Sequence, residues 1–193
     1  MGYEQTEDEK YSWLYTHGYD VGPVRMVYEW AASVAGSSWP PQKVVDLGCG
    51  RASLWKYGWK DYTGIDIASA IVRRNAKKIP SVKFVHGSIT KTPFEDGEFD
   101  MAFCVDVLEH LPEEAARLAV AEARRIARSG FFSISTRPSK CRSKEGEQLH
   151  LTIRQPSWWE QLFVEAEWRI EERQSGSDYI LLWVIRSGGF RPL

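Results

Sequence analysis

The sequence predicts an α/β protein with a doubly wound, mostly parallel sheet that ends in an antiparallel hairpin. β-rich runs alternate with helical patterns up to about residue 135, and this alternation is typical of parallel sheets covered by helices. The last two β-rich runs, 168–173 and 179–186, flank the turn-forming segment Ser175-Gly176-Ser177-Asp178, so they should pair as a hairpin. The 193 residues, 43% of them hydrophobic, are enough for one domain with its own core.

The chain before the first strand is expected to contain an extension and a helix. Residues 1–20 are acidic and then aromatic, and they should form the extension. Residues 21–35 have a helical pattern, which Ser37-Ser38-Trp39-Pro40-Pro41 should end. We assign 1–40 to a segment that covers the mouth of the binding site, within a single domain spanning 1–193.

Strands and helices should then alternate. The strands of the parallel part are expected at 43–47, 61–66, 82–85, 99–104 and 130–135, and the helices near 52–57, 68–78, 112–128 and 156–166. The helix at 112–128 has the clearest pattern, with one face formed by Ala115, Leu118, Ala119, Ala123 and Ile126. Gly130 is expected to end this helix, and Pro156 to begin the last one.

A glycine turn after the first strand is the most informative stretch of the chain. Residues 44–50 read Val-Val-Asp-Leu-Gly-Cys-Gly, and glycine allows the backbone to approach a ligand closely because it has no Cβ. Asp66 ends the next strand, 20 residues after Asp46. In nucleotide-binding α/β folds, an acid at this place accepts hydrogen bonds from ribose hydroxyls. The two features predict an adenosine-containing cofactor over the strand ends.

Three kinds of nucleotide site use a glycine turn after a strand. A dinucleotide site of the pattern G-x-G-x-x-G/A has Gly or Ala where this chain has Ser53, and a P-loop needs a Gly-Lys-Ser/Thr ending, which is absent. The third is an S-adenosylmethionine site. The segment 44–52 closely resembles the first motif of class I methyltransferases, acid-x-Gly-x-Gly-x-Gly, with Ala52 in place of the last glycine. Alanine there should narrow the turn slightly.

The resemblance to class I methyltransferases covers about residues 40–186. Residues 99–112 look like the family's fourth motif, and residues 82–89 resemble its third-strand motif, in which Ser88 replaces an acid that contacts adenine. The resemblance implies a seven-stranded sheet of order 3-2-1-4-5-7-6 and S-adenosyl-L-methionine as the cofactor. It also implies the cofactor-binding residues, which are Asp46, Leu47, Gly48, Cys49, Gly50, Asp66, Ile67, Ser88, Ile89 and Val105.

Four side chains after the fourth and fifth strands are candidates for the chemistry. They are Asp106, Glu109, His110 and His150. Glu109, His110 and His150 are the candidate catalytic residues, with an imidazole as acid or base. Together with Asp106 they could instead hold a divalent metal, which would favour the deprotonated form of an acceptor hydroxyl. The spacing is similar to that of small-RNA 2′-O-methyltransferases and ubiquinone-pathway O-methyltransferases. Glu-His-Leu-Pro is also widespread in members that use no metal, so purely structural roles stay open.

The charge composition limits the chemical class of the acceptor. The net charge of −1 argues against a nucleic-acid or anionic-membrane partner. Residues 137–147 hold four basic side chains, which could bind an anion or remain solvated. We therefore expect O-methylation of a small-molecule acceptor. Methylation of RNA or another polymer is the alternative, and a non-catalytic cofactor-binding subunit is the third possibility.

Cysteine usage and hydropathy indicate the compartment. Three cysteines without C-x-x-C spacing favour reduced thiols and a cytoplasmic location over a disulfide framework. No apolar run approaches the roughly 18 residues of a membrane span, and the acidic amino terminus lacks the apolar stretch of a signal peptide. The sequence does not predict an oligomeric state.

Overall fold

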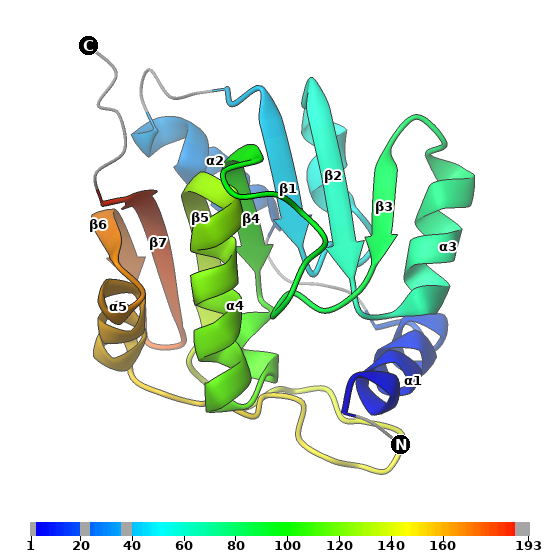
Figure 1. Cartoon of the computed structure of the whole chain (residues 1–193). Helices are drawn as coiled ribbons and strands as arrows, with labels where there is room; N and C mark the ends of the chain where they lie inside the picture. The colour runs from blue at the N-terminus through cyan, green and yellow to red at the C-terminus, as the bar shows by residue number, and fades with distance from the viewer. Residues whose placement is uncertain (1–2, 20–23, 36–39, 188–193) are drawn as a thin grey trace.

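The computed structural model describes residues 3–19, 24–35 and 40–187, which form a seven-stranded sheet flanked by helices (Figure 1). The strands are β1 (Lys43–Leu47), β2 (Asp61–Asp66), β3 (Lys83–His86), β4 (Phe99–Val105), β5 (Ala127–Ser135), β6 (Trp168–Ser175) and β7 (Tyr179–Arg186). The helices are α1 (Tyr3–Thr16), α2 (Val24–Val34), α3 (Ser69–Lys78), α4 (Glu113–Ile126) and α5 (Pro156–Glu165), with short 3-10 helices η2 (Ser53–Tyr57) and η3 (Leu108–His110).

The strand order is β3-β2-β1-β4-β5-β7-β6, as the sequence predicts. Strands β1 to β5 are parallel to their neighbours, and β7 lies antiparallel between β5 and β6. The carboxyl ends of the parallel strands therefore meet at one edge of the sheet, which is the lower edge in Figure 1. Loops after β1, β2, β3 and β4 meet there, and this edge is where ligands bind in open α/β sheets.

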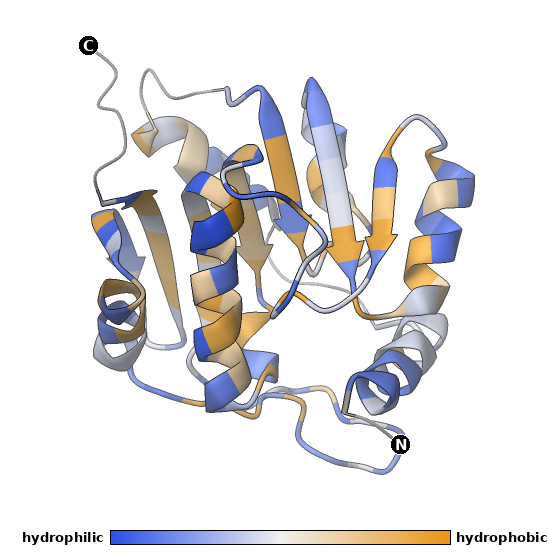
Figure 2. Cartoon of the chain, in the orientation of Figure 1, coloured by the Kyte–Doolittle hydropathy of each residue, from blue (hydrophilic) through white to orange (hydrophobic). Residues whose placement is uncertain are grey.

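Two hydrophobic cores lie on opposite faces of the sheet. Neighbouring residues of a strand point to opposite faces, so Val44 packs with the core of α2 while Val45 packs with the core of α4 and α5. Hydrophobic residues accordingly fill the central strands, and hydrophilic ones line the outer faces of the helices (Figure 2). This two-sided burial fixes the register of β1, and with it the position of the turn that follows.

The boundary between α4 and β5 differs from the prediction. The helix ends at Ile126 and the strand begins at Ala127, so Gly130 lies inside the strand instead of ending the helix. A Cβ at Gly130 would lie 2.6 Å from Cε2 of Phe132, so a glycine is needed here to make room for that ring. The parallel pairing of β5 with β4 therefore begins at Ala127. The polar residues at the start of β5 gave no indication of a strand there.

The buried face of α4 also differs from the prediction. Leu118 is 51% exposed and Ala115 is partly exposed, although both were placed on the inner face by their spacing. The residues that do face the core are Ala116, Ala119, Val120, Ala123 and Ile126. Val120 and Ala116, which are spaced four apart, therefore replace Leu118 and Ala115 in the apolar stripe.

The amino-terminal region forms helices. Where the sequence predicts only an extension, α1 packs against α3, and Tyr15 shares a small buried cluster with Ile71 and Val72. Helix α2 ends at Val34, and the segment 37–41 that should end it lies partly outside the described residues. No helix in the described part of the chain is long and apolar enough to cross a membrane.

Candidate active site

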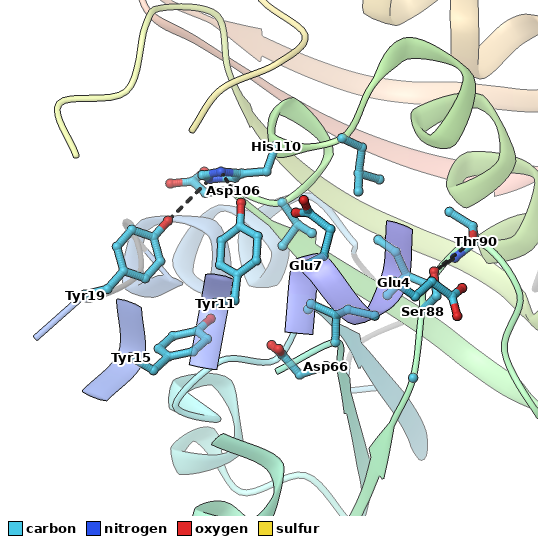
Figure 3. Close-up of a pocket in the computed structure, with 16 residues that line it drawn as sticks. Glu4, Glu7, Tyr11, Tyr15, Tyr19, Asp66, Ser88, Thr90, Asp106 and His110 are labelled. Carbon is cyan, nitrogen blue, oxygen red and sulfur yellow. Dashed lines mark hydrogen bonds between the residues drawn. The ribbon is translucent and has the colours of Figure 1, made fainter. Parts of the chain in front are cut away.

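One pocket opens at the carboxyl ends of the parallel strands (Figure 3). The loops after β1 to β4 form one side of it, and α1 with its following turn forms the other. The residues that line it are Glu4, Glu7, Tyr11, Tyr15, Tyr19, Gly48, Asp66, Ile67, Gly87, Ser88, Ile89, Thr90, Asp106, Val107, His110 and Leu111. None of these described lining residues is Lys or Arg, so the walls carry carboxylates, hydroxyls and aromatic rings but no fixed cation.

Three residues of the glycine turn have a left-handed backbone. Gly48 has φ +75°, and a Cβ there would lie 2.5 Å from Cγ2 of Val107 in the loop after β4. Gly50 has φ +47° and donates its N–H to Asp66 Oδ2 at 2.8 Å. Ala52 also has a left-handed backbone, with φ +54°. The family pattern has its third glycine at this position, and the left-handed backbone explains why, since glycine adopts that conformation without strain.

Two buried acids flank this turn. Asp66 accepts hydrogen bonds from the N–H groups of Gly50 and Ala68, both at 2.8 Å, and it reaches the pocket. Burial raises the pKa of Asp66 to about 6, although these bonds act to lower it. Asp46 lies beneath the turn and accepts the Tyr62 hydroxyl at 2.6 Å. Burial raises the pKa of Asp46 to about 7, against the effect of the Tyr62 bond.

The predicted cofactor residues divide into a lining group and a supporting group. Five line the pocket: Gly48, Asp66, Ile67, Ser88 and Ile89. The other five lie in β1, in the turn or at the end of β4 without lining it: Asp46, Leu47, Cys49, Gly50 and Val105. The Ser88 hydroxyl bonds the Thr90 hydroxyl at 2.8 Å, so it holds the loop after β3 in place at the same time.

Glu109 and His110 lie in η3, immediately beside the pocket. One carboxylate oxygen of Glu109, Oε1, accepts the Ser135 N–H at 3.0 Å, whereas the buried Oε2 has no hydrogen-bond partner among the described residues. Burial raises the pKa of Glu109 well above its usual range, and the nearby Asp106 adds to this. A buried carboxylate oxygen without a partner is costly, so this group favours either a proton or a cation.

The two histidines have the same hydrogen-bonding arrangement. Nδ1 of His110 lies 3.1 Å from the Leu149 carbonyl, and Nδ1 of His150 lies 2.6 Å from the Arg137 carbonyl. A carbonyl oxygen can only accept, so the hydrogen in each bond is on Nδ1, and each Nε2 presents a lone pair. Burial, assisted by His150, lowers the pKa of His110 to about 3, so the ring is neutral.

Three of the four predicted metal ligands come together. One donor atom each from Glu109, His110 and His150 lies within 4.8 Å of the others. Asp106 is outside this group, because its Oδ1 accepts the Ser133 hydroxyl at 2.7 Å and its backbone has φ +54°. Asp106 lines the pocket instead.

Tyrosines of the amino-terminal segment complete the pocket. The sequence predicts that segment 1–40 covers the mouth of the site but gives these side chains no role there. The Tyr11 hydroxyl lies 2.9 Å from Nδ1 of His110, and the Tyr19 hydroxyl lies 3.4 Å from Nε2 (Figure 3). Tyr15 lies nearer to Asp66, with its ring 5.6 Å from that of Tyr19. The spacing of four residues between these tyrosines was the available signal, because residues spaced four apart share one face of a helix.

The basic loop 137–147 contributes nothing to the pocket lining. Arg137 lies 3.6 Å from Asp178 of the hairpin turn, and the Ser143 hydroxyl accepts the N–H groups of Glu145 and Glu147. Within the described residues, this loop is therefore stabilised by its own polar contacts and by the hairpin. It does not supply a cation to the binding site.

Comparison with known proteins finds a methyltransferase domain in the chain. Residues 45–134 match the family model of a methyltransferase domain. This match covers a little under half of the chain and supports its assignment to the S-adenosylmethionine-dependent methyltransferases of class I. The chain is 32% identical over 132 residues to the ubiquinone biosynthesis O-methyltransferase of Methylococcus capsulatus, a match that covers 62% of this chain and 53% of that protein. It spans about half of that relative's length and less of several others.

Solved structures share the fold of this chain at low identity. The magnesium protoporphyrin IX methyltransferase of Synechocystis PCC 6803, solved with bound S-adenosylmethionine, is 17% identical with a TM-score of 0.70, and the match covers 97% of this chain and 98% of that one. The [4+2]-cyclase SpnF is 15% identical with a TM-score of 0.66, and the match covers 84% of this chain and 80% of that one. At these identities the likeness concerns the fold alone.

Proposed function

We propose that the protein transfers a methyl group from S-adenosylmethionine to an oxygen atom of a small-molecule acceptor. One observation carries the proposal: a single pocket is lined by the glycine turn and Asp66 on one side and by His110 on the other. A relative that is 32% identical is named as an O-methyltransferase, which supports oxygen as the methylated atom. The absence of Lys and Arg from the described lining favours an uncharged acceptor over a phosphate-rich polymer.

The cofactor side of the pocket would bind the nucleoside. Gly48 lines the pocket and its backbone would lie against the ligand, and Asp66 would accept hydrogen bonds from ribose hydroxyls. Ser88 and Ile89 line the pocket and would contact the adenine, as the family resemblance implies. When bound, the cofactor supplies an activated methyl group, so the protein's main task is to orient the acceptor and exclude water.

The acceptor side would orient a hydroxyl group. Nε2 of His110 can accept a hydrogen bond from that hydroxyl, with the ring held by the Leu149 carbonyl through Nδ1. Because burial lowers the pKa of His110 to about 3, the ring is a weak base and is better suited to positioning than to holding a full proton. An acceptor with an acidic hydroxyl, such as a phenol, therefore suits this site best.

Calorimetry with S-adenosylhomocysteine, followed by an assay of its release from S-adenosylmethionine with a panel of hydroxylated acceptors, tests the proposal. His110→Ala should lower kcat by about 100-fold with little change in nucleoside affinity, because the ring acts on the acceptor. His17→Ala is the control, since His17 is exposed at the end of α1. Failure of the wild-type protein to bind the nucleoside would refute the proposal.

A divalent metal at Glu109, His110 and His150 is a second proposal, and the residues fit one. Glu109, His110 and His150 offer a mixed O/N donor set whose atoms lie within 4.8 Å of one another, and Glu109 Oε2 has no partner among the described residues. Each imidazole is oriented by a carbonyl at Nδ1. A metal there would make an acceptor hydroxyl easier to deprotonate. Titration of the chelator-treated protein with Mn²⁺ should show binding that Glu109→Gln weakens, whereas no binding to the wild type would exclude the metal.

Two alternatives remain testable in the same assays. A polymer acceptor would give binding that weakens steeply with salt, and a small neutral acceptor would not. The [4+2]-cyclase among the structural neighbours illustrates a different chemistry on this fold. Tight nucleoside binding without methyl transfer to any acceptor would support such a non-methylating role.

A further inference from the structure

Helix α1 supplies the cap that α3 lacks. The residue before α3, Ala68, has no side chain that can cap the helix. Instead, Asp8 Oδ1 accepts the Ser69 N–H at 2.7 Å, and Ser12 Oγ accepts the Ala70 N–H at 3.2 Å. The first N–H groups of a helix need such acceptors, which normally come from the adjoining residue. Here they come from a helix that lies 61 and 58 residues earlier in the chain.

Asp8 is held in this position by several partners. The Ser12 hydroxyl donates to Asp8 Oδ1 at 2.9 Å, and Nε2 of His86 lies 3.4 Å from Asp8 Oδ2. Burial alone would raise the pKa of Asp8, but the bonds from Ser69 and Ser12 outweigh it and lower the pKa. A carboxylate is also favoured near the positive end of the α3 dipole. The contact is therefore strongest with Asp8 ionised.

The other end of α1 is fastened to the glycine turn. The Arg51 guanidinium donates to the Tyr15 carbonyl at 3.2 Å and to the Tyr19 carbonyl at 2.9 Å. Carbonyl groups at the end of a helix lack partners within the helix, and a cation there is favourable. Arg51 directly follows Gly50, so this contact ties the end of α1 to the turn after β1.

Both attachment points lie beside predicted cofactor residues. Ser69 is three residues after Asp66, whose Oδ1 accepts the Ala68 N–H. Arg51 is next to Gly50, whose N–H bonds the other oxygen of Asp66. Asp66 therefore connects the two loops that hold α1, while the stripe formed by Tyr11, Tyr15 and Tyr19 covers the pocket between them (Figure 3).

We propose that α1 is a lid whose closure is coupled to nucleoside binding, and that Asp8 and Arg51 are the positioning residues that close it. The proposal rests on the proposed function, since the coupling requires a nucleoside at Asp66. Asp66 holds both loops through its two carboxylate oxygens, so a nucleoside bound at Asp66 stabilises both attachment points of α1 together. Closure in turn covers the nucleoside with the tyrosines and places Tyr11 against His110.

Three variants test the lid: Asp8→Ala, Asp8→Asn and Glu9→Ala. Asp8→Ala removes the acceptor of the Ser69 N–H, whereas Asp8→Asn keeps an oxygen at that position. Glu9→Ala removes a charge from the same helix at an exposed site and is the matched control. The measurements are the dissociation rate of S-adenosylhomocysteine and hydrogen exchange of the α1 backbone with and without that nucleoside.

Asp8→Ala should release the nucleoside about five- to tenfold faster, which corresponds to the loss of one helix cap. Its α1 amides should lose most of the protection that the nucleoside confers on the wild type. Asp8→Asn should recover much of the slow release and much of the protection of the α1 amides, and Glu9→Ala should match the wild type in both. Equal release rates for Asp8→Ala and Glu9→Ala would overturn the proposal.

Failure of the lid can be separated from failure of the proposed function. If the wild type binds no nucleoside, the proposed function is wrong, but α1 exchange in the ligand-free protein still reports on the attachment. Faster exchange of α1 in Asp8→Ala than in Glu9→Ala would support the positioning role. Identical exchange in the two variants would refute it. Arg51→Met should have the same effect as Asp8→Ala, because it removes the attachment at the other end of the helix.

Discussion

At the scale of single residues, the departures from the family pattern have structural causes. Ala52 occupies a left-handed position where the pattern has glycine, and it is buried with 1% exposure. A left-handed alanine costs about 1–2 kcal/mol, and the buried methyl group offsets part of this through its contacts. The turn thus tolerates alanine without needing it.

Ala52→Gly should change the free energy of unfolding by less than about 0.5 kcal/mol, because relief of strain offsets the flexibility that glycine adds. Ala121→Gly is the matched control, since Ala121 is exposed in the middle of α4, and glycine there should cost about 1 kcal/mol. Urea unfolding of both variants measures the difference. An equal loss in the two would show that the left-handed backbone at residue 52 carries no strain.

Buried Asp46 makes stability depend on pH in a defined direction. Its pKa is about 7 in the folded protein, above its usual value of 3.8, so the folded state binds the proton more tightly than the unfolded state. The ionisation of Asp46 therefore costs stability progressively as the pH rises from about 4 to about 7.

Comparison of the wild type with Asp46→Asn tests this direction. The wild type should lose stability relative to Asp46→Asn between pH 5 and pH 8, because the amide does not ionise. Asp61→Asn, at an exposed position of β2, should show no such drift against the wild type. Urea midpoints at about pH 5 and about pH 8 provide the measurement, and a constant difference for Asp46→Asn would contradict the assignment.

At the scale of secondary-structure elements, burial distinguishes leucines that look equivalent in the sequence. Leu118 of α4 is 51% exposed, whereas Leu162 of α5 is 1% exposed in the core on the same side of the sheet. Exposed substitutions away from special features change stability little, and buried leucines lose both transfer energy and packing.

Leu118→Ala should therefore stay within about 0.5 kcal/mol of the wild type in unfolding free energy, while Leu162→Ala should lose about 2–5 kcal/mol. Thermal or urea unfolding followed by circular dichroism measures both. A large loss for Leu118→Ala would mean that its side chain is covered by a contact outside this chain.

At the scale of the whole molecule, the sheet was predictable because its signals are local. Strands such as β1 and β4 are short, mostly apolar runs followed by a turn, and the alternation of strands with helices predicts the parallel part of the sheet. The cofactor side was predictable for a similar reason, since the turn with Gly48 and the strand end at Asp66 are each recognisable within a few residues. The prediction that Gly130 ends the preceding helix was wrong, because that glycine is needed for a close contact with Phe132 inside β5.

The other half of the site depends on contacts between distant residues, which sequence spacing does not determine. Asp8 meets Ser69, 61 residues later, and Tyr19 meets Arg51, 32 residues later. Helix α1 has no broad apolar face that would reveal its place. The metal group was only partly predictable, because the spacing of Asp106, Glu109 and His110 does not determine which side chains turn inward. The left-handed backbone of Asp106 directs that carboxylate to Ser133.

The opposite placement of the two described chain ends affects how the protein should be prepared for assay. Glu4 lies at the pocket mouth, whereas β7 runs antiparallel to β5 and finishes at the far edge of the sheet. An affinity tag fused ahead of α1 would crowd the helix that covers the site, and one fused beyond β7 would leave it unhindered. Ligand-release rates measured on the two fusions should differ, with the carboxyl-terminal fusion matching the tag-free protein.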